Sequence, residues 1–245
     1  LIIAVGYQII RESHVEEDRQ SRIRLREALK QRYPDEAEAL RARYGIKPAV
    51  EEGYQEAGNG KSGNVILVHG LDEPGRIWMN LVPALMDGGF SVWLMLYPND
   101  QPVAEPAGLF KEEMLLFRKN GHETASIVAF SMGGLVAREM LTSPELEYRQ
   151  SVLDQSVPKV GQLIMIGTPN HGSALARFRI FAEFRDQLVN FFTGDYIWLQ
   201  SVLDGAGEAG LDLIPGSRFL EELNSRPHPE GVQMAVIPWD AQATV

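Results

Sequence analysis

The sequence predicts an α/β protein with a doubly wound, mostly parallel sheet. Short apolar runs rich in β-branched residues recur along it, separated by stretches long enough for crossover helices. The runs are continuous, which is typical of strands buried on both faces of a parallel sheet, and their alternation with helices favours the doubly wound architecture. The predicted strands are Val65–Val68, Ser91–Tyr97, Ser126–Phe130, Gln162–Ile166 and Val232–Ile237, and the predicted helices are Ile77–Asp87, Ala107–Asn120 and Gly133–Leu141.

Composition excludes several classes of protein. The 245 residues are ample for a large buried core. The net charge of −10 gives the chain no overall basic footprint, so we expect no nucleic-acid partner. Cysteine is absent, which excludes disulfides, thiolate zinc sites and a cysteine nucleophile but leaves the cellular compartment open, cytoplasmic or membrane-tethered.

The N-terminal segment, residues 1–10, is uncharged and apolar. It is shorter than the roughly 20 residues that a membrane-spanning helix needs. Because the first residue is Leu1 and not Met, one hypothesis is that the segment is the remnant of a signal anchor and associates with a membrane. The alternative is a segment that docks on the rest of the protein.

Residues 11–60 are predicted to form a charged helical arm and a linker. From Arg11 to Tyr44 there are nine Lys or Arg and eight Asp or Glu residues, mixed along the segment. We expect a break near Pro34 and a second short helix, Asp35–Tyr44, ended by Gly45 at its C-cap. Charges of mixed sign favour a solvated face or a partner-docking helix. The α/β domain is then predicted over residues 61–245.

The strongest chemical signal is a serine between a predicted strand and a predicted helix. The stretch SIVAFSMGG places Ser131 on this turn, with the small residues Ala129 and Gly133 two positions to either side. That layout is the nucleophile elbow, in which strand and helix backbones approach closely. The helix after Ser131 also directs the positive end of its dipole at the serine oxygen. The alternative is that Ser131 only caps the helix.

A second signal comes from VILVHGL, in which the first strong strand ends in His69 and Gly70. The backbone N–H of Leu71, together with that of Met132, would form a two-donor oxyanion hole beside Ser131. His69 lies at the tip of this early strand, and we expect it to support the loop and not to act as the base.

The motifs AFSMGGLVAR, VHGL, IGTPNHGS and DLIPGSRFLEELN together resemble the α/β-hydrolase superfamily. The similarity is to its lipase and esterase branch, which includes triacylglycerol lipases and GPI inositol-deacylase-like proteins, and it covers residues 64–240. The resemblance implies hydrolysis of a carboxylic ester by a Ser-His-Asp triad, with no metal and no organic cofactor. Asp240 matches the position of the triad acid, and the weaker candidates Asp212 and Asp100 are interpreted as turn or capping residues.

The triad histidine has no match in the sequence. The five histidines are His14, His69, His122, His171 and His228, and none follows Asp240. The five residues after Asp240 are too few for a crossover to another parallel strand. We therefore expect the sequence to be truncated, with the last strand and the general base beyond Val245. His171 is the fallback base.

An aromatic insert is predicted over about residues 174–214. Its aromatic residues recur at helical spacing, which indicates an amphipathic helix. One interpretation is a cap that lines an apolar substrate pocket with Phe181, Phe184 and Trp198, and the other is a helix packed on the sheet.

Together, these patterns predict a serine hydrolase of a small-molecule or lipid ester. An acyltransferase or thioesterase would use the same residues, and a non-catalytic, hydrolase-like binding protein is the alternative from a different class. The sequence does not indicate an oligomeric state.

Overall fold

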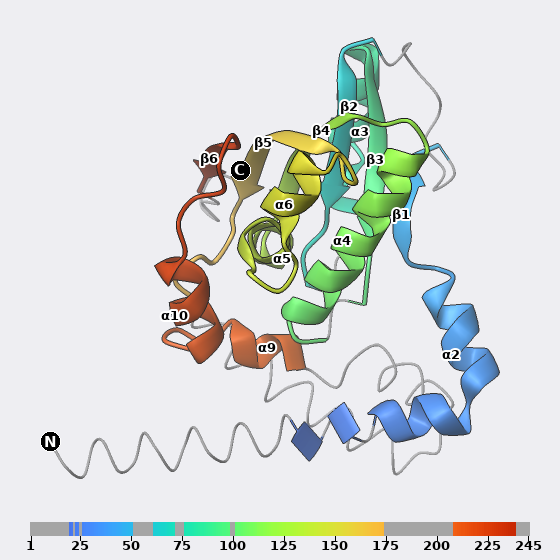
Figure 1. Ribbon diagram of the computed structural model, residues 1–245, viewed down its shortest axis with the longest axis vertical. Coiled ribbons are helices and arrows are strands. Elements are labelled where there is room, and N and C mark those ends of the chain that lie inside the picture. The colour runs from blue at the N-terminus through green and yellow to red at the C-terminus, as the bar shows by residue number, and fades with distance from the viewer. Residues whose placement is uncertain are drawn as a thin grey trace, which may run out of the picture.

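The structure is a computed structural model that describes residues 20–21, 23–24, 26–50, 61–71, 76–98, 101–173 and 208–238. Its described strands form one six-stranded sheet in the order β1-β3-β2-β4-β5-β6 (Figure 1). β1 runs antiparallel to β3 and every other pair is parallel, which confirms the predicted mostly parallel sheet. The strands are β1 (Gly45–Pro48), β2 (Gly63–Val68), β3 (Phe90–Leu96), β4 (Thr124–Phe130), β5 (Lys159–Ile166) and β6 (Gln233–Ile237).

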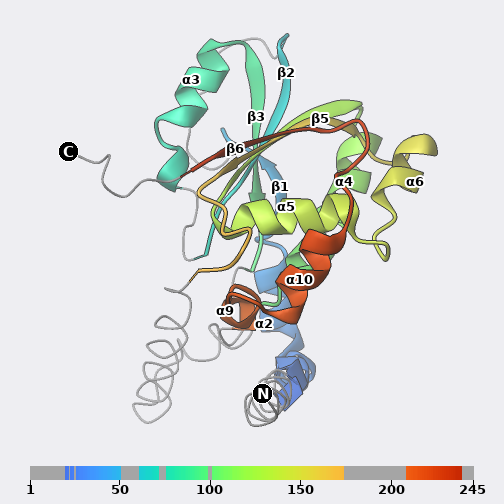
Figure 2. The same cartoon turned by 90° about the vertical axis from the view of Figure 1, so that its left-hand side faces the viewer.

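Helices cover both faces of the sheet, as the doubly wound architecture requires. α3 lies on one face, and α4, α5 and α6 lie on the other (Figure 2). α3 begins four residues later than predicted, because a 3-10 turn at Arg76–Trp78 precedes it. The described helices are α2 (Pro34–Arg41), α3 (Leu81–Asp87), α4 (Ala104–Lys119), α5 (Met132–Thr142), α6 (Tyr148–Leu153), α9 (Glu208–Asp212) and α10 (Arg218–Ser225).

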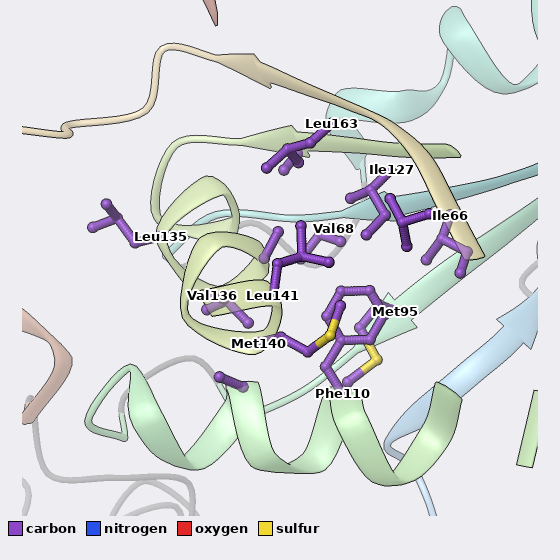
Figure 3. Packing of buried hydrophobic residues seen from close by; sticks show 14 of the residues in the cluster. Ile66, Val68, Met95, Phe110, Ile127, Leu135, Val136, Met140, Leu141 and Leu163 are labelled. Carbon is purple, nitrogen blue, oxygen red and sulfur yellow. The ribbon is translucent and has the colours of Figure 1, made fainter. Parts of the chain in front are cut away.

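Each face of the sheet carries its own apolar core. Ile66 and Val68 belong to the cluster beneath α4 and α5, where Phe110 and Met140 pack (Figure 3). Val65 and Leu67, which alternate with them along β2, belong to the cluster beneath α3. Side chains alternate between the two faces of a strand, and here both faces are buried, so the run is apolar throughout.

The predicted helix end at Tyr44, with Gly45 as its C-cap, is wrong. The short helix α2 ends at Arg41, and Gly45 is the first residue of β1, not a helix C-cap. Gly45 has a φ of 127°, and a Cβ built there would lie 2.6 Å from Glu113 Oε2. The same carboxylate accepts a hydrogen bond from the N–H of Ile46 at 3.1 Å. The four-residue strand GIKP lacks the apolar run by which the longer strands were predicted.

The charged arm docks on α4. Arg26, in the helical stretch 26–32, is buried and bonds to Glu105 in the first turn of α4. Arg41, at the end of α2, contacts Glu112 at 3.3 Å. Helices α2, α9 and α10 all lie below the sheet in the two views (Figures 1 and 2). Part of the mixed charge of the arm therefore serves contacts within the chain.

Residues 1–10, the candidate membrane anchor, lie outside the described residues. Within the described ranges, no helix has the length and apolar character that crossing a membrane would need.

A partly buried ion pair attaches the segment after α10 to α5. Arg226 donates to Glu139 at 2.6 Å, and the side chains are 19% and 6% exposed. We expect Arg226→Met to lower the free energy of unfolding by about 2 kcal/mol, because it leaves a buried carboxylate without its cation. Urea unfolding would measure the change. Arg149→Met, which breaks the exposed pair with Glu230, should cost less than about 0.5 kcal/mol. Equal costs for the two variants would contradict this ranking.

Candidate active site

Ser131 has a strained backbone at the junction of β4 and α5. Its φ is 51° and its ψ is −124°, a region that non-glycine residues rarely adopt. Its N–H donates to the carbonyl of Ile166 in β5 at 2.8 Å, and its own carbonyl accepts from Gly134 N–H at 3.1 Å. These bonds hold the turn to the neighbouring strand and to the first turn of the helix. The side chain is half-buried.

The capping alternative for Ser131 does not fit the geometry. Ser131 occupies the N-cap position of α5, but its side chain makes no capping hydrogen bond. Ser217, at the N-cap of α10, shows the usual arrangement, with φ at −64° and Oγ accepting from Leu220 N–H at 3.3 Å. A capping serine needs no positive φ, so capping does not explain the strain at Ser131.

Two glycines allow the loop after β2 to approach the serine turn. A Cβ on Gly133 would lie 2.4 Å from the carbonyl oxygen of His69 and 2.5 Å from that of Val68. A Cβ on Gly70 would lie 2.9 Å from Ser131 Cβ. The His69–Gly70 turn is thus packed directly against the start of α5, which is the proximity that a two-donor oxyanion hole requires.

His69 is engaged within its own loop. Its ring is buried, and Nδ1 lies 2.8 Å from the carbonyl oxygen of Gly70. A carbonyl can only accept, so Nδ1 carries the proton of this hydrogen bond. The ring stacks on Tyr97 with centroids 4.3 Å apart, and the Tyr97 hydroxyl donates to the His69 carbonyl at 2.6 Å. These contacts agree with the expected supporting role of His69. Tyr97 was missed as a member of the site.

The loop after β5 packs against α5 at the next residue, Gly134. A Cβ on Gly134 would lie 2.0 Å from Thr168 Oγ1, a buried atom with no hydrogen-bond partner among the described residues. Arg138 of α5 donates to Asn170 Oδ1 at 2.7 Å and to Asn224 Oδ1 at 3.0 Å. Burial lowers the pKa of Arg138, and nearby Arg226 lowers it further while Glu139 raises it. These bonds tie the loop to α10.

No described histidine makes a hydrogen bond to the Ser131 side chain. His122 stacks on Phe117 at 4.1 Å, and burial lowers its pKa. His228 is exposed and contacts Met234 Sδ. His171 is exposed in the loop after β5, and His14 lies outside the described residues.

Of the three candidates for the triad acid, only Asp212 lies among the described residues. Asp240 and Asp100 lie outside the described residues. Asp212 is 1% exposed, and its Oδ2 accepts from the N–H of Val103 at 2.8 Å. Val103 is the N-cap residue of α4, so Asp212 places a carboxylate at the start of that helix, where its dipole favours negative charge. This is a capping role, as expected, but on a helix remote in the sequence.

The predicted substrate-binding residues Phe181, Phe184 and Trp198 lie outside the described residues. Among the side chains that the structure describes, no group of three His, Asp or Glu could hold a metal ion.

The sheet order, the strained serine turn and the glycines around it are those of an α/β hydrolase fold. A solved structure agrees on the fold. The mature form of Bacillus licheniformis lipase BlEst2 matches with a TM-score of 0.50 and 16% identity, covering 75% of this chain and 68% of that chain. The chain therefore has the α/β-hydrolase fold that the sequence resemblance implied.

Two further solved structures resemble the chain more weakly. Phospholipase PlaB from Legionella pneumophila matches with a TM-score of 0.47 and 20% identity, over 74% of this chain and 41% of that one. Carboxylesterase CesB from Bacillus subtilis matches with a TM-score of 0.41 and 14% identity, over 74% of this chain and 78% of that one. No protein-family model matches the sequence, and no curated protein matches it.

Proposed function

We propose that the protein is a serine hydrolase that cleaves carboxylic esters through an acyl-enzyme on Ser131. The observation that carries the proposal is the positive φ of Ser131, which is not a glycine and whose side chain makes no capping hydrogen bond. Strain of this kind persists only where the surrounding structure imposes it, and it concentrates at functional sites. In the α/β-hydrolase fold, a strained turn between a strand and a helix is the usual position of the nucleophile.

In the proposed reaction, Ser131 Oγ attacks the ester carbonyl carbon and loses its proton to a general base. The carbonyl oxygen becomes an oxyanion held by the N–H groups of Leu71 and Met132. Collapse of this intermediate expels the alcohol, which takes up the proton and leaves the acyl group on Ser131. Water then attacks the acyl-enzyme by the same route and releases the carboxylic acid.

Asp240 is the proposed acid of the triad, on the strength of the sequence resemblance alone. The general base is not assigned to His69 or His122, because their rings are engaged by Tyr97 and Phe117. His171 is the described histidine whose loop follows the strand next to β4, and it remains the candidate base among the described residues.

For the substrate, we propose an ester with an apolar acyl group, such as a lipid ester. The support is the name of the similar B. licheniformis structure, a lipase, together with the aromatic composition around Phe181, Phe184 and Trp198. Membrane association through residues 1–10 stays a prediction. An acyltransferase or thioesterase would form the same intermediate on Ser131, and a choice between these activities depends on the acceptor that releases the acyl group.

Labelling with a fluorophosphonate probe tests the proposal. The probe phosphonylates a serine that is activated as a nucleophile, so we expect one label per chain, located on Ser131 by peptide mass spectrometry. Ser131→Ala should take up none, whereas Ser217→Ala, which removes a capping hydroxyl, should be labelled as the wild-type chain is. Absence of label on the intact protein would favour the non-catalytic binding protein.

A further inference from the structure

Tyr97 contacts the loop that carries the proposed oxyanion donor. It is the residue directly after β3 and is buried. Its hydroxyl donates to the carbonyl oxygen of His69 at 2.6 Å, and its ring stacks on the imidazole of His69 at an interplanar angle of 14°. Tyr97 therefore fixes both the backbone and the ring of His69. Burial raises the pKa of Tyr97 above its ordinary value, so the hydroxyl keeps its proton as a donor.

The ring of His69 in turn fixes the peptide group that follows. Nδ1–H of His69 donates to the carbonyl oxygen of Gly70 at 2.8 Å. The peptide bond between Gly70 and Leu71 is trans, so the N–H of Leu71 points opposite to that carbonyl. Holding the Gly70 carbonyl therefore sets the direction of the Leu71 N–H. Tyr97 holds the ring that makes this bond.

The carbonyl oxygen of His69 is packed against the start of α5. A Cβ on Gly133 would lie only 2.4 Å from that oxygen, so α5 closes one side of it. The Tyr97 hydroxyl is its hydrogen-bond donor at 2.6 Å. The carbonyl is thus held between Tyr97 and the helix that begins after Ser131.

We propose that Tyr97 is a positioning residue for ester hydrolysis, which orients the Leu71 N–H toward the developing oxyanion by holding His69. This inference rests on the proposed function, because it assigns a role within the same site. The proposed role of Tyr97 involves no contact with the substrate. It acts through His69, and its contribution belongs to the transition state, where the oxyanion is formed.

The test compares Tyr97→Phe with Tyr148→Phe. Tyr97→Phe keeps the stacked ring and removes only the hydroxyl. Tyr148 is a matched control, because its buried hydroxyl donates to the Pro158 carbonyl at 3.2 Å and accepts from Val160 N–H at 2.7 Å. These partners lie at the start of β5, whereas Ser131 follows the end of β4.

For Tyr97→Phe we expect kcat on a short, soluble ester to fall about tenfold, with KM within about twofold of the wild-type value. The rate constant for fluorophosphonate labelling should fall by a similar factor. Hydrogen exchange of the Gly70 and Leu71 amide protons, followed by NMR, should become faster. Tyr148→Phe should leave all three measurements within about twofold, although it removes a comparable buried hydroxyl.

An unchanged kcat in Tyr97→Phe, or equal losses in both variants, would overturn the positioning role. The exchange measurement separates this proposal from the proposed function. If the wild-type chain is not labelled at all, ester hydrolysis fails as the function, and unchanged exchange at Leu71 would then overturn the orienting contact as well. Faster exchange restricted to Tyr97→Phe would support the contact independently of activity.

Discussion

Replacing Ser131 with glycine is expected to raise the stability of the protein while removing the proposed ester hydrolysis. The backbone at this residue has a φ of 51° and a ψ of −124°, and such a conformation costs a non-glycine residue about 1–3 kcal/mol. Glycine adopts it freely but adds entropy to the unfolded chain, which costs about 0.5–1 kcal/mol. The net expectation for Ser131→Gly is a gain of about 1 kcal/mol in the free energy of unfolding.

Activity should move in the opposite direction. Removal of a triad serine typically lowers kcat by about 10⁶-fold, because only binding and the oxyanion donors remain. Urea unfolding and hydrolysis of a p-nitrophenyl ester would measure the two effects on one preparation.

Two other variants separate the effect of backbone strain on stability from the effect of the serine hydroxyl on hydrolysis. Ser131→Ala removes the nucleophile but keeps a Cβ, so it should lose hydrolysis without the gain in stability. Gln155 also has a positive φ, 56°, in a turn after α6, so Gln155→Gly should relieve strain without changing activity. A Ser131→Gly protein that still hydrolyses esters would show that the nucleophile lies elsewhere. One with no gain in stability would show that the turn is not strained.

The sequence predicted those parts of the fold that have local apolar signals. The run Val65–Val68 could be assigned because a strand buried on both faces needs apolar residues at every position. β1 could not, because an edge strand of four residues that includes Lys47 and Pro48 makes no such demand. Gly45 looked like a helix C-cap because glycine serves any position with positive φ, at a helix end or at the start of a strand.

The candidate site was predictable only where its geometry is local in the sequence. Ser131 and Gly133 lie in one strand-to-helix junction, and their spacing indicates the close approach directly. The contact of Asp212 with Val103 joins residues 109 positions apart and leaves no local pattern. Tyr97 offered a weak signal, since a hydroxyl that ends an apolar run is buried and needs a partner. That partner, the His69 carbonyl, is visible only once the two strands are paired.

Gly133→Ala is expected to lower the free energy of unfolding by about 2–3 kcal/mol. The new Cβ would lie 2.4 Å from the His69 carbonyl oxygen and 2.5 Å from that of Val68, and both are backbone atoms. Val68 is held in the sheet by β3 and β4, so the clash cannot be relieved by a side-chain rotation. Alanine favours a helix over glycine by about 1 kcal/mol, which offsets only part of this cost.

The clash should also lower the activity of the Gly133→Ala molecules that do fold. The atom that must move, the His69 carbonyl oxygen, is the acceptor of the Tyr97 hydroxyl, so the proposed oxyanion loop is displaced with it. The folded fraction of Gly133→Ala is therefore expected to lose at least about tenfold in kcat. Gly108, in the interior of α4, is the matched control, because a Cβ there meets nothing within 4 Å. Gly108→Ala should stabilise the protein by about 0.5–1 kcal/mol and leave kcat unchanged. If both alanine variants stabilise the protein, then α5 does not approach the loop after β2 as closely as the structure places it, and the oxyanion hole would have to be sought elsewhere.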